Sequence, residues 1–150
     1  KEIMNKLAPG GNVYQASTFA GNPISVTAAI NSIKTINKNK NKMYAKLERN
    51  CELLVDEIDD LATDHKIPHQ INSIASMFQI FFSSKPVTNY DTSKSADGKK
   101  FNKLFVNLLK NGVFIAPSQF ESVFLSDAHT DADITKTLGA YGLSLKAVKH

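Results

Sequence analysis

The sequence is poor in the residues that build disulfides, nucleic-acid sites and membrane spans. A single cysteine, Cys51, excludes an internal disulfide, and its place in an apolar helical repeat predicts a buried thiol. Arg49 is the only arginine, and the lysines are scattered around a net charge of +4, so we expect no nucleic-acid partner. No apolar run approaches the ~20 residues that cross a membrane, and no signal peptide is visible. We therefore expect a cytoplasmic protein.

Patterns typical of common cofactor and metal sites are absent as well. The sequence has no G-x-G-x-x-G, no P-loop and no C-x-x-C. His65 and His69 are four residues apart, but Pro68 interrupts any helix between them, so we expect no metal site. Asp59 and Asp60 are adjacent and would point in different directions on a helix, which predicts that both are solvated.

Apolar periodicity predicts the secondary structure. With 150 residues, 42% apolar and 21% charged, the chain can bury a normal core. Steps of three and four residues predict helices, and short apolar runs predict strands. The polar stretches at 37–41 and 84–100 predict a connector and a surface excursion. The expected elements are helices at 26–36, 44–61, 101–109 and 134–145, and strands at 77–82, 113–115 and 123–125.

Helix boundaries are marked by local signals. Asn22 can cap a helix that has Pro23 in its first turn. Gly112 provides a C-terminal stop, and Thr130 with Asp133 resembles a capping box. The heptad-like spacing between residues 44 and 61 leaves a coiled coil open, although an ordinary packed helix fits its mixed core better. The order of elements indicates an α+β fold, with a small, mostly antiparallel sheet and helices on one face.

Two loops stand out as candidate sites. Residues 13–23, VYQASTFAGNP, place small and hydroxyl side chains before a capped helix, which suits either an anion site or a plain loop. Residues 116–121, APSQFE, carry one acid, Glu121, between two predicted strands. A lone glutamate on a loop is more often solvated than functional, so the residues alone leave both readings open.

Both loops resemble segments of glutamate-1-semialdehyde aminomutases, which are fold-type-I, class III aminotransferase-like enzymes that use pyridoxal 5'-phosphate (PLP). The first loop is similar to the V-Y-Q-A-G-T-x-x-G-N-P stretch of that family. The second, with residues 126–134 (SDAHTDADI), is similar to its A-P-S-x-F-E…S-x-A-H-T-x-x-D-I ending. Residues 1–9 also resemble the segment that precedes the loop, and residues 1–7 read as the end of a helix already in progress. We therefore expect that the chain is the C-terminal portion of such an enzyme.

The resemblance implies roles for three residues. Ser17 and Thr18 would contact the cofactor phosphate of the neighbouring subunit in a homodimer, although Ser17 replaces the family's glycine. Glu121 would face the substrate region. The lysine that bonds to the cofactor would lie upstream, so the chain would hold no catalytic residue and be inactive alone. Residues 1–36 would end the large PLP-binding domain, and residues 37–150 would form the small α+β domain.

The implied reaction of the parent enzyme is the conversion of glutamate 1-semialdehyde to 5-aminolevulinate in tetrapyrrole (porphyrin) biosynthesis. An ω-amino-acid aminotransferase of class III is an alternative, because such enzymes share the T-F-x-G-N-P loop. Gln15 and residues 118–121 favour the aminomutase. A non-catalytic packing or dimerisation module is the alternative for the isolated chain.

Overall fold

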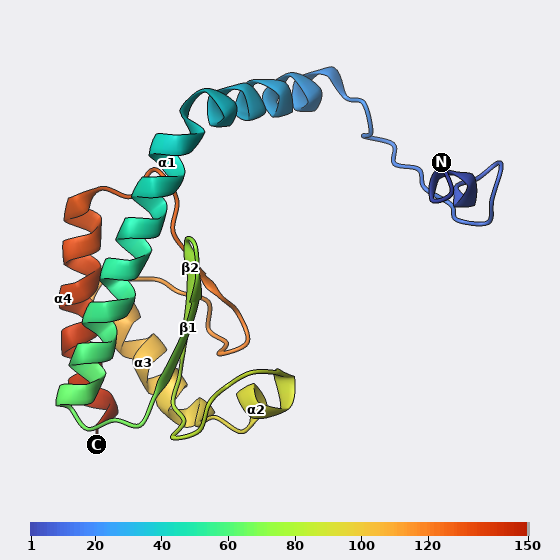
Figure 1. Cartoon of the computed structure of the whole chain (residues 1–150). Helices are drawn as coiled ribbons and strands as arrows, with labels where there is room; N and C mark the ends of the chain where they lie inside the picture. The colour runs from blue at the N-terminus through green and yellow to red at the C-terminus, as the bar shows by residue number, and fades with distance from the viewer. Residues whose placement is uncertain (150) are drawn as a thin grey trace. The chain divides into compact units, whose positions relative to one another are not determined.

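The computed structural model describes residues 1–149, which form two compact units, Lys1–Lys40 and Asn41–His150. Each unit is described by itself. A 3-10 turn, η1, opens the chain, and helix α1 runs through the division between the units (Figure 1). The assignment of residues 1–36 to a large cofactor domain stays a prediction. The elements are η1 Met4–Lys6, α1 Pro23–Asp64, β1 Gln70–Ile74, β2 Met77–Phe81, α2 Tyr90–Lys94, α3 Gly98–Lys110, β3 Val123–Phe124 and α4 Asp131–Val148.

The predicted connector at residues 37–41 is wrong, because α1 is one continuous helix of 42 residues. After Pro23 its sequence contains neither glycine nor proline, the two residues that most strongly disfavour a helix interior. Lysine is a good helix former and asparagine a moderate one, so the polar NKNKN stretch remains helical and exposed. The two predicted helices are therefore parts of a single element.

The sheet has three antiparallel strands in the order β1-β2-β3. The predicted strand at 77–82 is confirmed as β2, and a hairpin joins it to β1, which the sequence did not predict. Ile74 pairs with Met77, and Ala75 at the tip takes a positive φ of 51°. Three of the five residues of β1 are exposed, so the apolar pattern of a buried strand is missing there.

The strand predicted at 113–115 is wrong, although the one at 123–125 is confirmed as β3. The N–H of Val113 donates to the carbonyl of Leu108 at 2.9 Å, so this residue closes the end of α3. Ile115 is buried in the core, but within a segment that pairs with no strand among residues 1–149. Val113 and Ile115 therefore pack in or against the core without forming a strand, and the described sheet has three strands.

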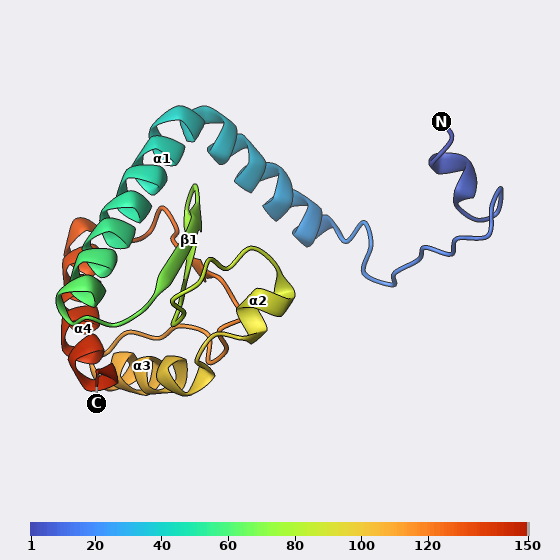
Figure 2. The ribbon, with the colours of Figure 1, turned by 60° about the horizontal axis from the view of Figure 1, so that its bottom comes forward.

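Three helices cover one face of the sheet, as the sequence predicted. In Asn41–His150 the second part of α1 lies beside α4, with α3 close by (Figures 1 and 2). Phe78 and Ile80 project from β2 into the core that these helices form. Gln79 and Phe81 alternate with them and therefore lie on the outer face. The α+β architecture is confirmed, and its core comes from α1, β2, α3 and α4.

The predicted surface excursion at 84–100 contains more structure than expected. It holds the short helix α2, which starts at a capping box between Asn89 and Thr92. Val87 and Ala96 are buried with Phe81 in a small cluster on the outer face of the sheet. The excursion therefore partly covers this face, and its turn residues mark the start of α2.

Candidate functional site

The loop before α1 is a pair of turns that ends in the predicted cap. The N–H of Ala20 donates to the carbonyl of Ser17 at 3.1 Å, and that of Asn22 donates to Phe19 at the same distance. Gly21 has a φ of +77°, in the left-handed region that favours glycine. The Asn22 side-chain oxygen accepts from the N–H groups of Ile24 and Ser25, which confirms Asn22 as the N-cap.

Ser17 and Thr18 are both exposed at the start of these turns. Among residues 1–149, the backbone N–H groups of Ser17, Thr18 and Phe19 donate no hydrogen bond, and neither hydroxyl has a partner. Ser17 is not in the left-handed region, so a side chain in place of glycine causes no backbone strain here. Free donors next to a helix N-terminus fit the oxygens of a phosphate group.

The second predicted loop, residues 116–121, is attached to the outer face of the sheet by buried amides. Gln79 donates from Nε2 to the carbonyl of Gln119 at 3.0 Å. Gln119 donates from its own Nε2 to the carbonyl of Ser93 in α2 at 3.1 Å. Neither glutamine was predicted as a site residue, and the one signal for them in the sequence is the polar Gln79 inside the apolar run of β2.

Glu121 follows in the same loop and is exposed. Its N–H donates to the carbonyl of Ser118 at 3.1 Å, and the N–H of Phe120 donates to the Ser118 hydroxyl at 3.2 Å. The Phe120 ring packs on Tyr90 of α2 with ring centroids 5.7 Å apart. The loop backbone is therefore ordered by local bonds. Within residues 1–149 the Glu121 carboxylate has no hydrogen-bond or ion-pair partner, which leaves it free to bind a donor.

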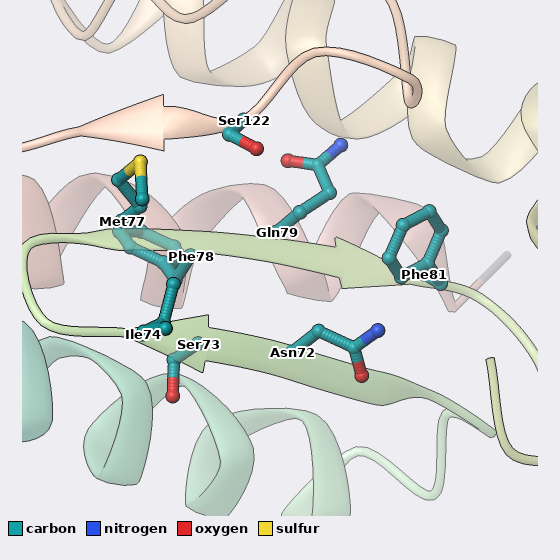
Figure 3. A pocket seen from close by; sticks show the side chains of 8 residues that line it. All are labelled: Asn72, Ser73, Ile74, Met77, Phe78, Gln79, Phe81 and Ser122. Carbon is teal, nitrogen blue, oxygen red and sulfur yellow. The ribbon is translucent and has the colours of Figure 1, made fainter. Parts of the chain in front are cut away.

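A hollow of about 240 Å³ lies on the outer face of the sheet beside this loop (Figure 3). Gln79 points from β2 toward Ser122, the residue after Glu121, and Asn72 lies on the neighbouring strand β1. No charged side chain lines the hollow. Its lining suits neutral hydrogen bonds and apolar contact; an anion would find no counter-charge there. The lining residues are Asn72, Ser73, Ile74, Met77, Phe78, Gln79, Phe81 and Ser122.

The turn before α4 has a structural role in this chain. The N–H of Ser126 donates to Nδ1 of His129 at 3.0 Å, so the imidazole closes the turn. The Thr130 hydroxyl and the Asp133 carboxylate form the predicted capping box of α4. Hydrogen bonds from the backbone and side chain of Thr130 lower the pKa of Asp133. The A-H-T-x-x-D part of the family-like motif thus starts a helix.

The histidines that the structure describes, within residues 1–149, belong to no metal-binding group. His69 binds the carbonyl of Ile67 through Nδ1 at 2.8 Å and contacts Asp59 through Nε2 at 2.9 Å. Asp59 is therefore paired with His69, but its side chain stays 57% exposed and Asp60 is exposed as well, so the predicted solvation of both is confirmed. No group of three or more His, Cys, Asp or Glu side chains suited to a metal ion occurs in residues 1–149. His150 lies outside the described residues.

Two further expectations concern burial and membranes. Cys51 is 1% exposed and unpaired, as predicted, and burial raises the pKa of its thiol. Among the helices of the described chain, none is both long and apolar enough to cross a membrane.

The site residues predicted from the sequence fall into both compact units. Ser17 and Thr18 belong to Lys1–Lys40, and Glu121 belongs to Asn41–His150. Within the second unit the structure bonds the loop that carries Glu121 to the buried Gln79 through the carbonyl of Gln119. The loop with Ser17 and Thr18 and the loop with Glu121 are therefore each described within its own unit.

Comparison with known proteins extends over the whole chain. The family model described as Aminotransferase class-III matches residues 1–140. A glutamate-1-semialdehyde 2,1-aminomutase of Nitrosopumilus maritimus is 71% identical over 150 residues, which are 100% of this chain and 35% of that protein. A second protein of this description, from Cenarchaeum symbiosum, is 52% identical over 149 residues, covering 99% of this chain and 35% of its own length. The chain therefore spans about a third of the length of these relatives.

Solved structures share the fold. An ω-transaminase from Sphaerobacter thermophilus superposes with a TM-score of 0.78 at 18% identity, over 99% of this chain and 34% of that one. A β-phenylalanine aminotransferase from Variovorax paradoxus gives a TM-score of 0.76 at 22% identity, over 95% of this chain and 32% of that one. At these identities the likeness establishes the fold alone.

Proposed function

The chain belongs to the aminotransferase class-III family, and from this premise we propose that the protein containing it is a PLP-dependent aminomutase. The proposed reaction converts glutamate 1-semialdehyde to 5-aminolevulinate, a step of tetrapyrrole synthesis. The observation that carries this proposal is 71% identity over all 150 residues to a relative named for the reaction. The two family-like loops lie within that match.

Ser17 and Thr18 are the proposed phosphate ligands. Their free N–H groups and hydroxyls precede the capped start of α1, where backbone donors and the helix dipole favour an anion. When bound, PLP supplies an electron sink for rearrangement at a carbon that bears nitrogen. Following the resemblance, we propose that these residues serve the cofactor of a neighbouring subunit, so the protein acts as a homodimer in the cytoplasm.

Glu121 is the proposed contact to the substrate. Its carboxylate is exposed and unpaired among residues 1–149, so it can accept a hydrogen bond from an amino group of the substrate. The ordered loop around Ser118 limits the places that the carboxylate can reach. Its role in this proposal is to orient the substrate.

The domain assignment is also a proposal: residues 1–36 end a large cofactor-binding domain, and residues 37–150 form a small one. An exposed apolar stripe supports it, because contiguous exposed apolar surface favours packing against another surface. The 150 residues alone would then be inactive, since the lysine that bonds to the cofactor belongs to the rest of the protein. The stripe consists of Val26, Ile30, Ile33 and Ile36, which are 39–58% exposed.

The test is an assay of the full-length protein with PLP and glutamate 1-semialdehyde. We expect 5-aminolevulinate to form without any added amino acceptor. Glu121→Gln should lower kcat/KM, and the 150-residue chain should yield no product and retain no PLP after dialysis. The absence of product from the intact, PLP-loaded protein would refute the aminomutase.

The same assay separates the aminomutase from an ω-amino-acid aminotransferase. An aminotransferase passes its amino group to a second substrate, so its turnover depends on an acceptor such as 2-oxoglutarate. The aminomutase returns the amino group to the same carbon skeleton and needs none. Strict dependence on 2-oxoglutarate would therefore favour the aminotransferase.

A further inference from the structure

Two buried glutamines connect the loop that carries Glu121 to the rest of its unit. Gln79 of β2 donates to the carbonyl of Gln119 at 3.0 Å, and Gln119 donates to the carbonyl of Ser93 in α2 at 3.1 Å. Gln79 is 5% exposed and Gln119 is 8% exposed. The two bonds form a chain from the middle of the sheet, through the loop, to α2.

Packing alone does not account for amides at these positions. A polar group in a buried place costs free energy unless it is hydrogen-bonded, and both side chains leave Oε1 without a partner among residues 1–149. Apolar side chains of similar size would fill the same space without that cost. The amides add positional specificity, because a buried hydrogen bond fixes one arrangement of the groups that it joins.

We propose that Gln79 and Gln119 are positioning residues for Glu121, which rests on the function proposed above. Glu121 lies two residues after Gln119, and its carboxylate has no partner of its own within residues 1–149. The backbone of the loop therefore sets the place of the carboxylate. The Gln79–Gln119 bond holds that backbone against the sheet, and Gln119–Ser93 holds it against α2.

The test uses the full-length protein with Gln79→Met and Gln119→Met. Methionine has nearly the length of glutamine but no N–H donor, so it removes the hydrogen bonds and largely preserves packing. A small displacement of a group that contacts substrate is costly, and we expect each variant to lower kcat/KM about tenfold or more. Each change is also made in a Glu121→Gln background, where we expect almost no additional loss.

Gln70→Met is the matched control. Gln70 lies on β1, and its side chain donates only to the carbonyl of its neighbour His69, so the change should leave kcat/KM within about twofold of wild type. Circular dichroism and thermal unfolding verify that every variant is folded. The double-variant comparison is the decisive readout, because a general loss of structure would lower activity equally in both backgrounds.

Three results would overturn the inference. The glutamine variants could keep wild-type kcat/KM, their losses could persist in full in the Glu121→Gln background, or Glu121→Gln itself could have no effect. Each of these is compatible with an active aminomutase. Failure of the proposed function looks different, since the wild-type protein itself would then form no 5-aminolevulinate, and the inference would fall with it.

Discussion

At the scale of single residues, adjacent side chains of α1 differ sharply in how far the core of Asn41–His150 buries them. Leu54 of α1 is 1% exposed, whereas the adjacent Leu53 is 45% exposed. Leu54→Ala should leave a cavity and lower the free energy of unfolding by about 2–5 kcal/mol. Leu53→Ala should cost no more than about 0.5 kcal/mol, as exposed positions usually do. Urea unfolding followed by circular dichroism measures both, and equal losses would contradict the orientation of α1.

The thiol of Cys51 gives a second residue-scale prediction. Burial raises its pKa, and the charge of Glu52 adds to this, so the reactive thiolate is scarce at pH 8 as well as inaccessible. We expect iodoacetamide to modify Cys51 slowly in the folded protein and rapidly in urea. Mass spectrometry measures the two rates. Equal rates would mean that the thiol is not enclosed between α1 and the other helices.

At the scale of elements, α4 depends on the capping box at its start. The Thr130 hydroxyl accepts from the N–H of Asp133, and the Asp133 carboxylate accepts from the N–H of Thr130. Thr130→Ala should lower the free energy of unfolding by about 1 kcal/mol. Thermal unfolding measures the loss, and Thr135→Ala is the control, because Thr135 bonds only to a carbonyl within the helix.

The Asp133 carboxylate of this capping box makes the stability of the protein depend on pH. The pKa of Asp133 is lower in the folded protein than in the unfolded chain, because Thr130 donates hydrogen bonds to the charged form. Its stabilisation is therefore complete above the unfolded pKa and is lost as the pH falls through the folded pKa. Asp133→Asn should destabilise the protein at pH 7 and converge with wild type in acid.

The matched control for Asp133 is Asp131→Asn in the same first turn. The Asp131 side chain takes no part in the box, so this change should be milder at pH 7. Chemical unfolding at pH 7, 5 and 3 measures the difference from wild type for both variants. A loss at Asp133 that persists unchanged at pH 3 would contradict the carboxylate's role.

The elements that the sequence predicted well are those with local causes. The caps at Asn22 and Thr130 and the stop at Gly112 depend on neighbours a few residues away, and all three are observed. The connector in α1 was mispredicted because polar composition was taken for an interruption, although no residue there breaks a helix. Strand β1 was missed because pairing with β2 defines it, and pairing is not visible in its own residues.

At the scale of the whole molecule, the candidate site was predictable only in part. Motif likeness pointed to Ser17, Thr18 and Glu121, and their roles remain proposals. Gln79 and Gln119 are 40 residues apart, and their hydrogen bond exists only once the sheet has brought the loop to β2. No local pattern identifies such a pair. Residues that hold a site in place through long-range hydrogen bonds are therefore harder to predict from sequence than residues that lie in a recognisable motif.

The two compact units should differ in resistance to proteolysis. Every buried residue of the described chain lies after residue 46, and residues 1–40 bury none. Local opening is easiest where few apolar contacts must be broken. We therefore expect trypsin to cut the 150-residue chain first between Lys34 and Lys42 or nearer its N-terminus, leaving a product close to residues 41–150. Mass spectrometry over a time course identifies the order of cleavage.

The lysines of α3 provide the internal control for this order. Lys103 and Lys110 are exposed, as the lysines of 34–42 are, but α3 is anchored by Phe101, Leu104 and Leu108 in the core. Cleavage there requires opening of the core, so it should follow the first cuts by a wide margin. Simultaneous cleavage at Lys103 and Lys38 would mean that the second unit does not fold independently of other chain segments. A stable 41–150 product would place the stability of this chain in its α+β unit.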